Sequence, residues 1–347
     1  MKKEKRVKRK RRNYAVTVFP GDGIGPEVMA ATVKVLEATG VHFVWDFHDL
    51  GEFRADETTD HEEWCLAHEA KKSLARTRLG LKGPTRTPSV EGHRSLNVAL
   101  RKMFDLYVNV RPVKTMPSIK TRFMDLIIDM VIFRENLEDL YVGEEYPCEG
   151  GYIAISRFTE RECHRVAQYA FAYAEKHGRK KVTVVHKANI LKMTHGLFLR
   201  TAQEVAKEYP DIICDDILGD NLMTQVICDP DKFDCMLLPN FLGDLASDLG
   251  AGMIGKLGFA PGANIGPDCA VFEAVHGTAL DIAGKNIANP TALILSGAML
   301  LEHVGEKVIA GKVRNAVSRI LEEGTLISPD GRVTSTTAFA DAVVKNL

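Results

Sequence analysis

The sequence lacks the patterns that mark membrane-spanning, disulfide-rich and disordered proteins. Its longest apolar stretch, residues 292–301, is broken by Ser296 and Gly297, whereas a transmembrane helix needs about 18 uninterrupted apolar residues. Seven cysteines include no Cys-x-x-Cys pair, which argues against a disulfide framework and a zinc motif and favours a reducing compartment. Hydrophobic residues make up 45% and charged residues 26% of the 347, the composition of a globular protein.

A strong net charge is also missing, but the net value of −1 hides an uneven distribution. Residues 1–12 contain nine Lys/Arg and one Glu, which leaves 36 basic and 45 acidic side chains in the other 335 residues. Such a basic arm can contact nucleic acid or an anionic membrane, or serve as a targeting signal. We expect a solvated arm on a cytoplasmic protein, with the mitochondrial matrix as the alternative if the arm belongs to a targeting signal. Neither membrane association nor nucleic-acid binding is expected.

Short β-branched runs alternate with longer helical patterns along the chain. This alternation predicts an α/β protein with a substantial sheet. At about 150 residues per domain the length suggests two domains, and no Pro/Gly/Ser linker separates them, so we expect them to share a sheet or exchange strands. The predicted strands are residues 14–19, 125–133, 181–185 and 233–239, and the predicted helices are residues 27–39, 291–305 and 306–323.

A glycine-rich turn, Gly-Asp-Gly-Ile-Gly-Pro at residues 21–26, follows the first predicted strand and opens a helix. It is similar to a dinucleotide-binding loop, but Pro26 replaces the last glycine and no suitable acidic residue follows a second strand. A tight turn between strand and helix explains the same residues. Both interpretations stay open at this stage.

Several arginines occur at the predicted ends of apolar elements, close to a Ser and an Asn. Asn97 and Arg101 lie one helical turn apart after Ser95, which occupies a helix-capping position. Arg111 and Arg134 follow in apolar surroundings. Because guanidinium groups bind carboxylates through two parallel hydrogen bonds, the set suits a ligand with several carboxylates, although surface salt bridges are the plainer explanation.

Acidic residues form a second group with chemical potential. Asp244 and Asp248 share one face if residues 240–248 are helical, and their mutual repulsion would become binding energy around a divalent cation. Asp220 is a third candidate ligand, and carboxylate oxygen suits Mg²⁺ or Mn²⁺. A solvated helix face is the alternative.

An irregular, glycine-spaced stretch at residues 276–290 is a plausible adenosine-binding loop. Within it, the Asp281 carboxylate could accept hydrogen bonds from ribose hydroxyls and would repel a 2′-phosphate, which favours NAD over NADP. An ordinary surface aspartate is the alternative.

Taken together and in this order, the motifs resemble those of the decarboxylating β-hydroxyacid dehydrogenases, the isocitrate/isopropylmalate dehydrogenase family, and most closely its NAD-dependent isocitrate branch. The resemblance covers the chain from about Tyr14 to its end. It implies an isopropylmalate dehydrogenase-like α/β fold, not an ordinary Rossmann fold. The implied parts are a basic arm (1–12), a large cofactor-binding domain (13–106 and 255–347), a small dimerisation and substrate domain (107–138 and 160–254) and a dimer clasp (139–159).

The resemblance also implies a role for each matching residue. Lys187 and Asp220 would come from the neighbouring subunit, so an active enzyme would be at least a homodimer. The implied acid–base pair is Tyr141 and Lys187; the substrate ligands are Ser95, Asn97, Arg101, Arg111 and Arg134; the Mg²⁺ or Mn²⁺ ligands are Asp220, Asp244 and Asp248; and the NAD contacts are Ile24, Thr87, His276, Gly277, Asp281, Ile282 and Asn289.

The implied activity is oxidative decarboxylation of isocitrate to 2-oxoglutarate and CO₂ with reduction of NAD⁺, a reaction of the tricarboxylic acid cycle. Ser95 and Asn97 fit the isocitrate pattern, since isopropylmalate enzymes carry apolar residues there. The alternatives are a homoisocitrate or 3-isopropylmalate dehydrogenase and a non-catalytic regulatory subunit of a hetero-oligomer. Leu280, Met193 and His195 depart from the family pattern without removing a reacting group.

Overall fold

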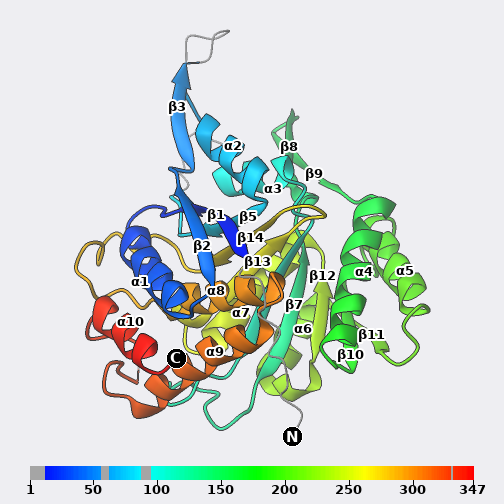
Figure 1. Ribbon diagram of the computed structural model, residues 1–347. Coiled ribbons are helices and arrows are strands. Elements are labelled where there is room, and N and C mark those ends of the chain that lie inside the picture. Colours follow the sequence, from blue (N-terminus) through cyan, green and yellow to red (C-terminus); the bar gives the residue numbers. More distant parts are fainter. Residues whose placement is uncertain (1–11, 56–61, 87–94, 330) are drawn as a thin grey trace, which may run out of the picture.

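A ten-stranded sheet forms the centre of the computed structural model, which describes residues 12–55, 62–86, 95–329 and 331–347 (Figure 1). The basic arm therefore lies outside the described residues, Arg12 excepted. The strands follow in the order β11 (Ile213–Leu218), β10 (Lys181–His186), β12 (Cys235–Leu238), β7 (Asp129–Glu135), β6 (Val108–Lys114), β13 (Pro261–Ile265), β14 (Ala270–Ala274), β5 (Leu79–Lys82), β1 (Asn13–Phe19) and β2 (His42–Phe47).

The sheet has two parallel parts that meet in antiparallel strands. The strands β11, β10, β12 and β7 run parallel to one another, as do β14, β5, β1 and β2. Between them, β6 pairs antiparallel with β7 and β13, and β13 pairs antiparallel with β14. The middle of the chain builds the first part and both chain ends build the second, so the α/β fold class and the shared sheet are confirmed. The exact domain boundaries stay a prediction.

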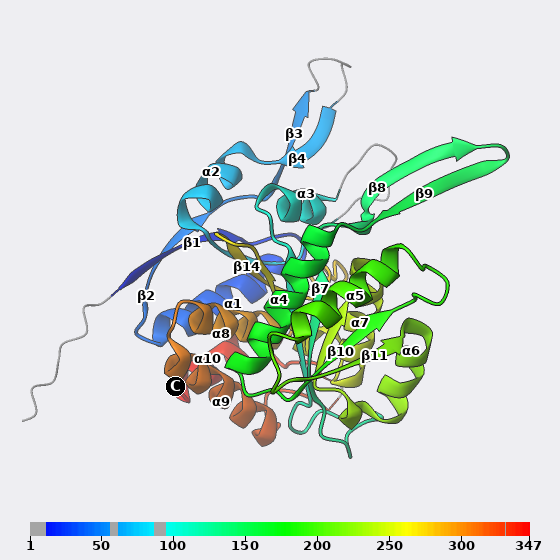
Figure 2. The ribbon, with the colours of Figure 1, turned by 90° about the vertical axis from the view of Figure 1, so that its right-hand side faces the viewer.

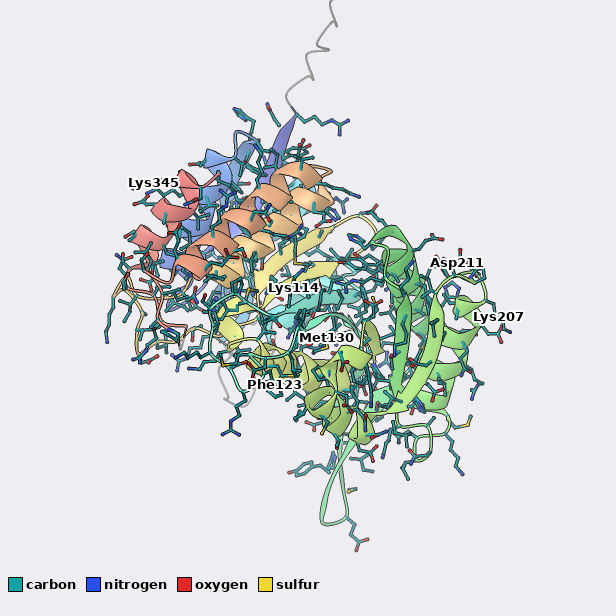
Figure 3. The ribbon with its side chains drawn as sticks, turned by 90° about the horizontal axis from the view of Figure 1, so that it is seen from below. Lys114, Phe123, Met130, Lys207, Asp211 and Lys345 are labelled. Atoms are coloured by element: carbon teal, nitrogen blue, oxygen red, sulfur yellow. The ribbon has the colours of Figure 1, made fainter. Side chains whose placement is uncertain are left out.

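Helices flank the sheet and bury its apolar strands. The helix α8 (Thr291–His303) is almost wholly buried against β13 and β14, as its uniformly apolar sequence predicts. Around it pack α1 (Gly25–Ala38) and α9 (Lys307–Glu323), and α10 (Thr336–Lys345) packs on these two. On the other part of the sheet, α4 (Glu160–Lys176) and α5 (Thr194–Ala206) cover β7, β10 and β12. Seen from below, Lys345 and Lys207 lie on opposite sides of the sheet and its covering helices (Figure 3).

Two hairpins extend beyond the sheet. The first pairs β8 (Asp139–Cys148) with β9 (Gly151–Arg157) and projects away from the body of the molecule (Figure 2). Its turn uses Gly150 at a φ of +74°, a conformation that favours glycine. Tyr152 is 83% exposed, and neighbouring apolar side chains are exposed with it. These residues match the predicted clasp, whose role in a dimer stays a prediction. The second hairpin joins β3 (Gly51–Ala55) and β4 (Glu62–Leu66) and was not expected.

Two predicted strands are longer than the observed ones. The strand predicted at 125–133 begins only at Asp129, because residues 122–126 form turns and Ile127 is 87% exposed despite its apolar side chain. The strand predicted at 233–239 is confined to β12, since Phe233 closes a 3₁₀ turn (Pro230–Lys232) and Pro239 precedes α7 (Asn240–Met253). The other predicted elements are confirmed within about two residues at each end.

The sequence also predicts that disulfide bonds and membrane-spanning helices are absent. All seven cysteines are free. In the described part of the chain, no helix has both the length and the apolar character required to cross a lipid bilayer.

Candidate active site

Three buried arginines converge on one side of the sheet. Arg111 lies on β6 and Arg134 on β7, with Arg134 directly opposite Asn109, two residues before Arg111, so both arginines project from the same face. Arg101 reaches this place from α3 (Leu96–Met103). Burial, and next the charge of Arg134, lowers the pKa of Arg101 to about 10 and that of Arg111 below its ordinary value. The residues Arg101, Arg111 and Arg134 are called the arginine cluster below.

Each arginine of the cluster keeps one buried nitrogen without a hydrogen-bond partner. These atoms are Arg101 Nε, Arg111 Nη1 and Arg134 Nη2. Leaving a buried charged donor unpaired is costly, and the three cannot all be satisfied by one another, because guanidinium groups only donate. A ligand that carries several negatively charged oxygens would satisfy them. Because all three arginines are buried, the ion pairs that they form with Glu273, Asp248 and Asp244 are not the surface salt bridges of the plainer alternative.

Arg134 is the most tightly held member of the cluster. Its Nε donates to Asn240 Oδ1 at 2.9 Å, and its Nη1 is paired with Asp244. Gly243 packs against its aliphatic part so closely that an added Cβ would lie 2.6 Å from Arg134 Cγ. The guanidinium carbon lies 4.8 Å from the ring centre of Tyr141. The start of α7 thus fixes Arg134 from several sides.

Tyr141 and Asp244 lie at the edge of the cluster beside Arg134, and the phenol donates a hydrogen bond to the Asp244 carboxylate. Burial and this hydrogen bond raise the pKa of Tyr141. Burial alone would raise the pKa of Asp244, but Arg134 and the Tyr141 hydrogen bond lower it. Tyr141 therefore keeps its proton while Asp244 is ionised. One turn along α7, burial raises the pKa of Asp248, whose carboxylate lies 3.7 Å from Arg111 Nη1.

Lys187 and Asp220 do not join the arginine cluster of the same chain. Lys187 follows β10, Asp220 begins α6 (Gly219–Cys228), and their side chains are hydrogen-bonded at 2.6 Å. Both line a cavity of about 540 Å³ with Phe241, Leu242 and Leu245 of α7, whereas Asp244 on the same helix contacts Arg134 and Tyr141. Among the described residues, no three His, Cys, Asp or Glu side chains are placed to hold a metal ion. One chain therefore presents the candidate residues in two separate groups, called half-sites below: the arginine cluster with Tyr141 and Asp244, and the pair of Lys187 and Asp220.

A nearby histidine supports Lys187. The Lys187 N–H donates to His195 Nδ1 at 3.0 Å, and burial lowers the pKa of His195, which favours its neutral form. His195, a departure from the family pattern, thus accepts a bond that fixes the loop after β10.

The substrate-side residues before Arg101 are partly placed. Ser95 is the N-cap residue of α3, as predicted, but its side chain does not accept the capping hydrogen bond. Asn97 Oδ1 accepts a hydrogen bond from Thr85 Oγ1 at 3.1 Å. Thr87 falls outside the described residues.

The glycine-rich turn joins loops and does not form an open phosphate cradle. The Asp22 N–H donates to Pro84 O and the Ile24 N–H to Thr278 O, so both are already used. A Cβ on Gly23 would lie 2.0 Å from Thr278 O, which requires glycine there. These contacts favour the tight-turn interpretation, and Ile24, which is buried, faces the neighbouring loops as part of the core.

The loop at 276–290 contains one unsatisfied atom and several exposed groups. His276 Nε2 is buried without a partner, while Nδ1 lies 3.1 Å from Gly277 O, and burial lowers the histidine pKa. Asp281 and Gly277 are exposed, and Ile282 packs on the core. Asn289 differs from the expectation in one respect, because its amide is used within the chain: Nδ2 donates to Gly331 O and Oδ1 accepts from the Thr291 N–H.

Glu135, which follows Arg134, carries a testable pH dependence. Burial raises its pKa from 4.5 to about 7, although the N–H groups of Leu137 and Glu138 donate to its carboxylate. Because the folded pKa is the higher one, stability is full below about pH 4.5 and falls as the pH rises to 7. Glu135→Gln should therefore gain about 1–3 kcal/mol in free energy of unfolding over the native chain between pH 5 and pH 8. Denaturant unfolding at both pH values measures this; an equal difference at both would contradict it.

Comparison with known proteins shows the family of this chain. A family model described as isocitrate/isopropylmalate dehydrogenase matches residues 15–343. The chain belongs to the isocitrate/isopropylmalate dehydrogenase family. Within that family, it is 43% identical over 334 residues to isocitrate dehydrogenase (NAD) catalytic subunit 5, mitochondrial, of Arabidopsis thaliana, covering 95% of this chain and 88% of that protein.

Another relative is named as regulatory instead of catalytic. The chain is 44% identical over 335 residues to a mitochondrial regulatory subunit of isocitrate dehydrogenase (NAD) from Dictyostelium discoideum, covering 96% of this chain and 91% of the relative. The crystal structure of isocitrate dehydrogenase from Methylococcus capsulatus superimposes with a TM-score of 0.87 at 44% identity, covering 96% of this chain and 99% of that one. Overall similarity to this family therefore does not by itself separate catalytic from regulatory members.

Proposed function

We propose that this chain is a catalytically active, NAD-dependent isocitrate dehydrogenase that oxidises and decarboxylates isocitrate to 2-oxoglutarate. The observation that carries the proposal is the arginine cluster, with three buried nitrogens that lack a hydrogen-bond partner and with Arg134 in contact with both Tyr141 and Asp244. A tricarboxylate supplies enough anionic oxygens for all three arginines. Ser95 and Asn97 add polar groups that suit a third carboxylate better than an alkyl chain, which favours isocitrate over 3-isopropylmalate.

The acidic residues fit a hard divalent cation. Asp244 and Asp248 lie one helical turn apart on α7, and Asp220 of a second copy of the chain would complete the set of ligands. Carboxylate oxygens are the donors that Mg²⁺ and Mn²⁺ prefer. Such an ion would polarise the substrate hydroxyl and stabilise the negative charge that develops on that oxygen during loss of CO₂.

Tyr141 and Lys187 would move the protons. The raised pKa of Tyr141 keeps its phenol protonated at neutral pH, which suits a general acid that protonates the carbon from which CO₂ leaves. Lys187 of a second copy would relay protons to Tyr141. The arginine cluster would orient the substrate and keep its carboxylates fixed during both oxidation and decarboxylation.

The loop at 276–290 would bind NAD⁺, which would accept the hydride from isocitrate. His276 Nε2 is a buried polar atom without a partner, and the exposed Asp281 carboxylate could accept from both ribose hydroxyls. The (NAD) in the relatives' names supports this choice. Gly277, Ile282 and Asn289 remain proposed contacts, with Asn289 limited by its internal hydrogen bonds.

A homodimer would unite the two half-sites. The cavity beside Lys187 and Asp220 has mostly apolar walls, and Phe241, Leu245 and Leu191 remain substantially exposed around it. An exposed apolar surface of this kind is typical of an interface. The projecting hairpin of β8 and β9 would interlock with its counterpart.

An assay of the purified chain tests the proposal. Initial rates of NADH or NADPH formation are measured with isocitrate, homoisocitrate and 3-isopropylmalate, each with NAD⁺ and NADP⁺, in the presence of Mg²⁺ or Mn²⁺. Isocitrate with NAD⁺ should give the highest kcat/KM. A folded dimer without activity on any of the acids would contradict the proposal.

A regulatory role is the second candidate, because relatives named as regulatory subunits match equally well. The presence of Tyr141, Lys187, Asp220, Asp244 and Asp248 favours catalysis, and activity of the chain alone would exclude a purely regulatory role. For the compartment, the relatives' mitochondrial names favour the matrix over the cytoplasm.

A further inference from the structure

A line of buried polar side chains crosses four neighbouring strands beside the arginine cluster. Asn109 and Arg111 lie two residues apart on β6 and so project from one face. Asn264 on β13 stands directly opposite Asn109, and Glu273 on β14 stands directly opposite Lys82 on β5. All five residues are buried. The sheet topology therefore places a continuous polar path between the two parallel parts of the sheet.

Hydrogen bonds connect every step of this path. Arg111 Nε donates to Asn109 Oδ1 at 2.6 Å, and Asn109 Nδ2 donates to Asn264 Oδ1 at 2.9 Å. Asn264 Nδ2 donates to Glu273 Oε1 at 2.7 Å, and Lys82 Nζ donates to Glu273 Oε2 at 2.7 Å. Arg101 Nη2 lies 3.8 Å from Glu273 Oε1, so a second member of the arginine cluster meets the same carboxylate.

The two ends of the path fix the direction of both amides. A guanidinium group only donates, so Asn109 must turn its oxygen toward Arg111 and its NH₂ toward Asn264. A carboxylate only accepts, so Asn264 must turn its NH₂ toward Glu273. Burial opposes ionisation of Glu273, but Lys82 and Arg101 hold its pKa at about 2, so it remains a carboxylate. In this low-dielectric setting, aligned hydrogen bonds strengthen one another.

We propose that Asn109 and Asn264 are positioning residues that orient Arg111 for its ligand by coupling its guanidinium to the ionised Glu273. This inference rests on the proposed function, which assigns Arg111 to a carboxylate of the substrate. With Nε fixed by Asn109, the guanidinium plane is set, and Nη1, which has no hydrogen-bond partner and lies 3.7 Å from Asp248, is directed to the ligand side. Without the fixed plane, binding would have to order a long, flexible side chain.

The matched test compares Asn109→Ala with Asn136→Ala. Asn136 is also buried, and its Nδ2 donates to the same Asn264 Oδ1 and to Leu106 O, but it is not part of the path to Arg111. Both variants should lose thermal stability. Asn109→Ala should raise KM for isocitrate about tenfold or more with a smaller change in kcat, whereas Asn136→Ala should leave KM within about twofold.

An equal rise in KM in both variants, or an unchanged KM in Asn109→Ala, would overturn the inference. If Asn109→Ala does not fold, Asn109→Thr supplies the same comparison, because its hydroxyl lies one bond nearer the backbone than Oδ1 and falls short of Arg111 Nε. A wild-type chain that neither binds nor turns over isocitrate would instead overturn the proposed function, and this inference with it.

Discussion

Replacing Lys187 by Met should lower kcat about 10²–10⁴-fold, the usual cost of removing a general acid–base group. The substitution keeps most of the length of the side chain and removes the ammonium group that bonds to Asp220 at 2.6 Å. Because Asp220 is exposed and Lys187 is only half-buried, folding stability should change little. Steady-state rates with isocitrate and NAD⁺, together with the thermal midpoint, measure both effects.

Lys181→Met is the matched control for this variant. Lys181 begins the same strand, β10, and its ammonium lies 3.3 Å from Asp215, but it is remote from the cavity that Lys187 lines. It should keep kcat within about twofold. Equal activity of the Lys187 and Lys181 variants would show that Lys187 takes no part in catalysis.

Arg134→Met should reduce kcat/KM by about 10²–10³-fold or more. The change removes a buried charge that would bind substrate and leaves Asn240 Oδ1 and the Asp244 carboxylate without their partner. Losing one member of a charge pair at a binding site typically costs about 2–5 kcal/mol. Most of the loss should fall on KM for isocitrate, whereas KM for NAD⁺ should change less. Kinetics with each substrate varied in turn measure the two constants.

Arg179→Met provides the comparison for Arg134. Arg179 is paired with Asp129 and Asp234 near the starts of β7 and β12, whereas Arg134 lies near the end of β7. Its replacement should lower the free energy of unfolding and leave KM for isocitrate close to the wild-type value. A similar rise of KM in both variants would mean that Arg134 acts only through stability.

The sequence predicts elements best where one physical signal dominates. An almost uninterrupted apolar run predicted α8, which the structure confirms. The shared face of Asp244 and Asp248 was stated only for the case that residues 240–248 are helical, and α7 itself was not predicted. The start of β7 was placed too early, because the apolar residues before Asp129 were interpreted as strand although Leu126 and Ile127 are exposed and precede it. Composition alone does not distinguish an apolar turn from a buried strand.

The candidate site, like the fold, was predicted only in part from the sequence. Arginines in apolar surroundings predicted a carboxylate-binding cluster, and the structure brings Arg101, Arg111 and Arg134 together. The contributions of Asn264 and Glu273 were missed because they lie about 150 residues after Asn109 in the chain. Only the register of the sheet brings them close to Asn109. An isolated buried Asn or Glu carries no local signal of its partner. The same holds for Asn289, whose internal hydrogen bonds only the fold reveals.

The central claim is that a complete active site combines the arginine cluster of one subunit with Lys187 and Asp220 of another. Mixing the Arg134→Met and Lys187→Met chains under conditions that exchange subunits tests it most directly, with isocitrate held near the wild-type KM so that both variants are nearly inactive on their own. Random exchange makes about half of the dimers hybrids, each with one intact site of two, so about a quarter of wild-type activity should return. Each variant treated alone should stay inactive. Hybrid dimers, verified by differential tags, that remain as inactive as their parents would contradict the account.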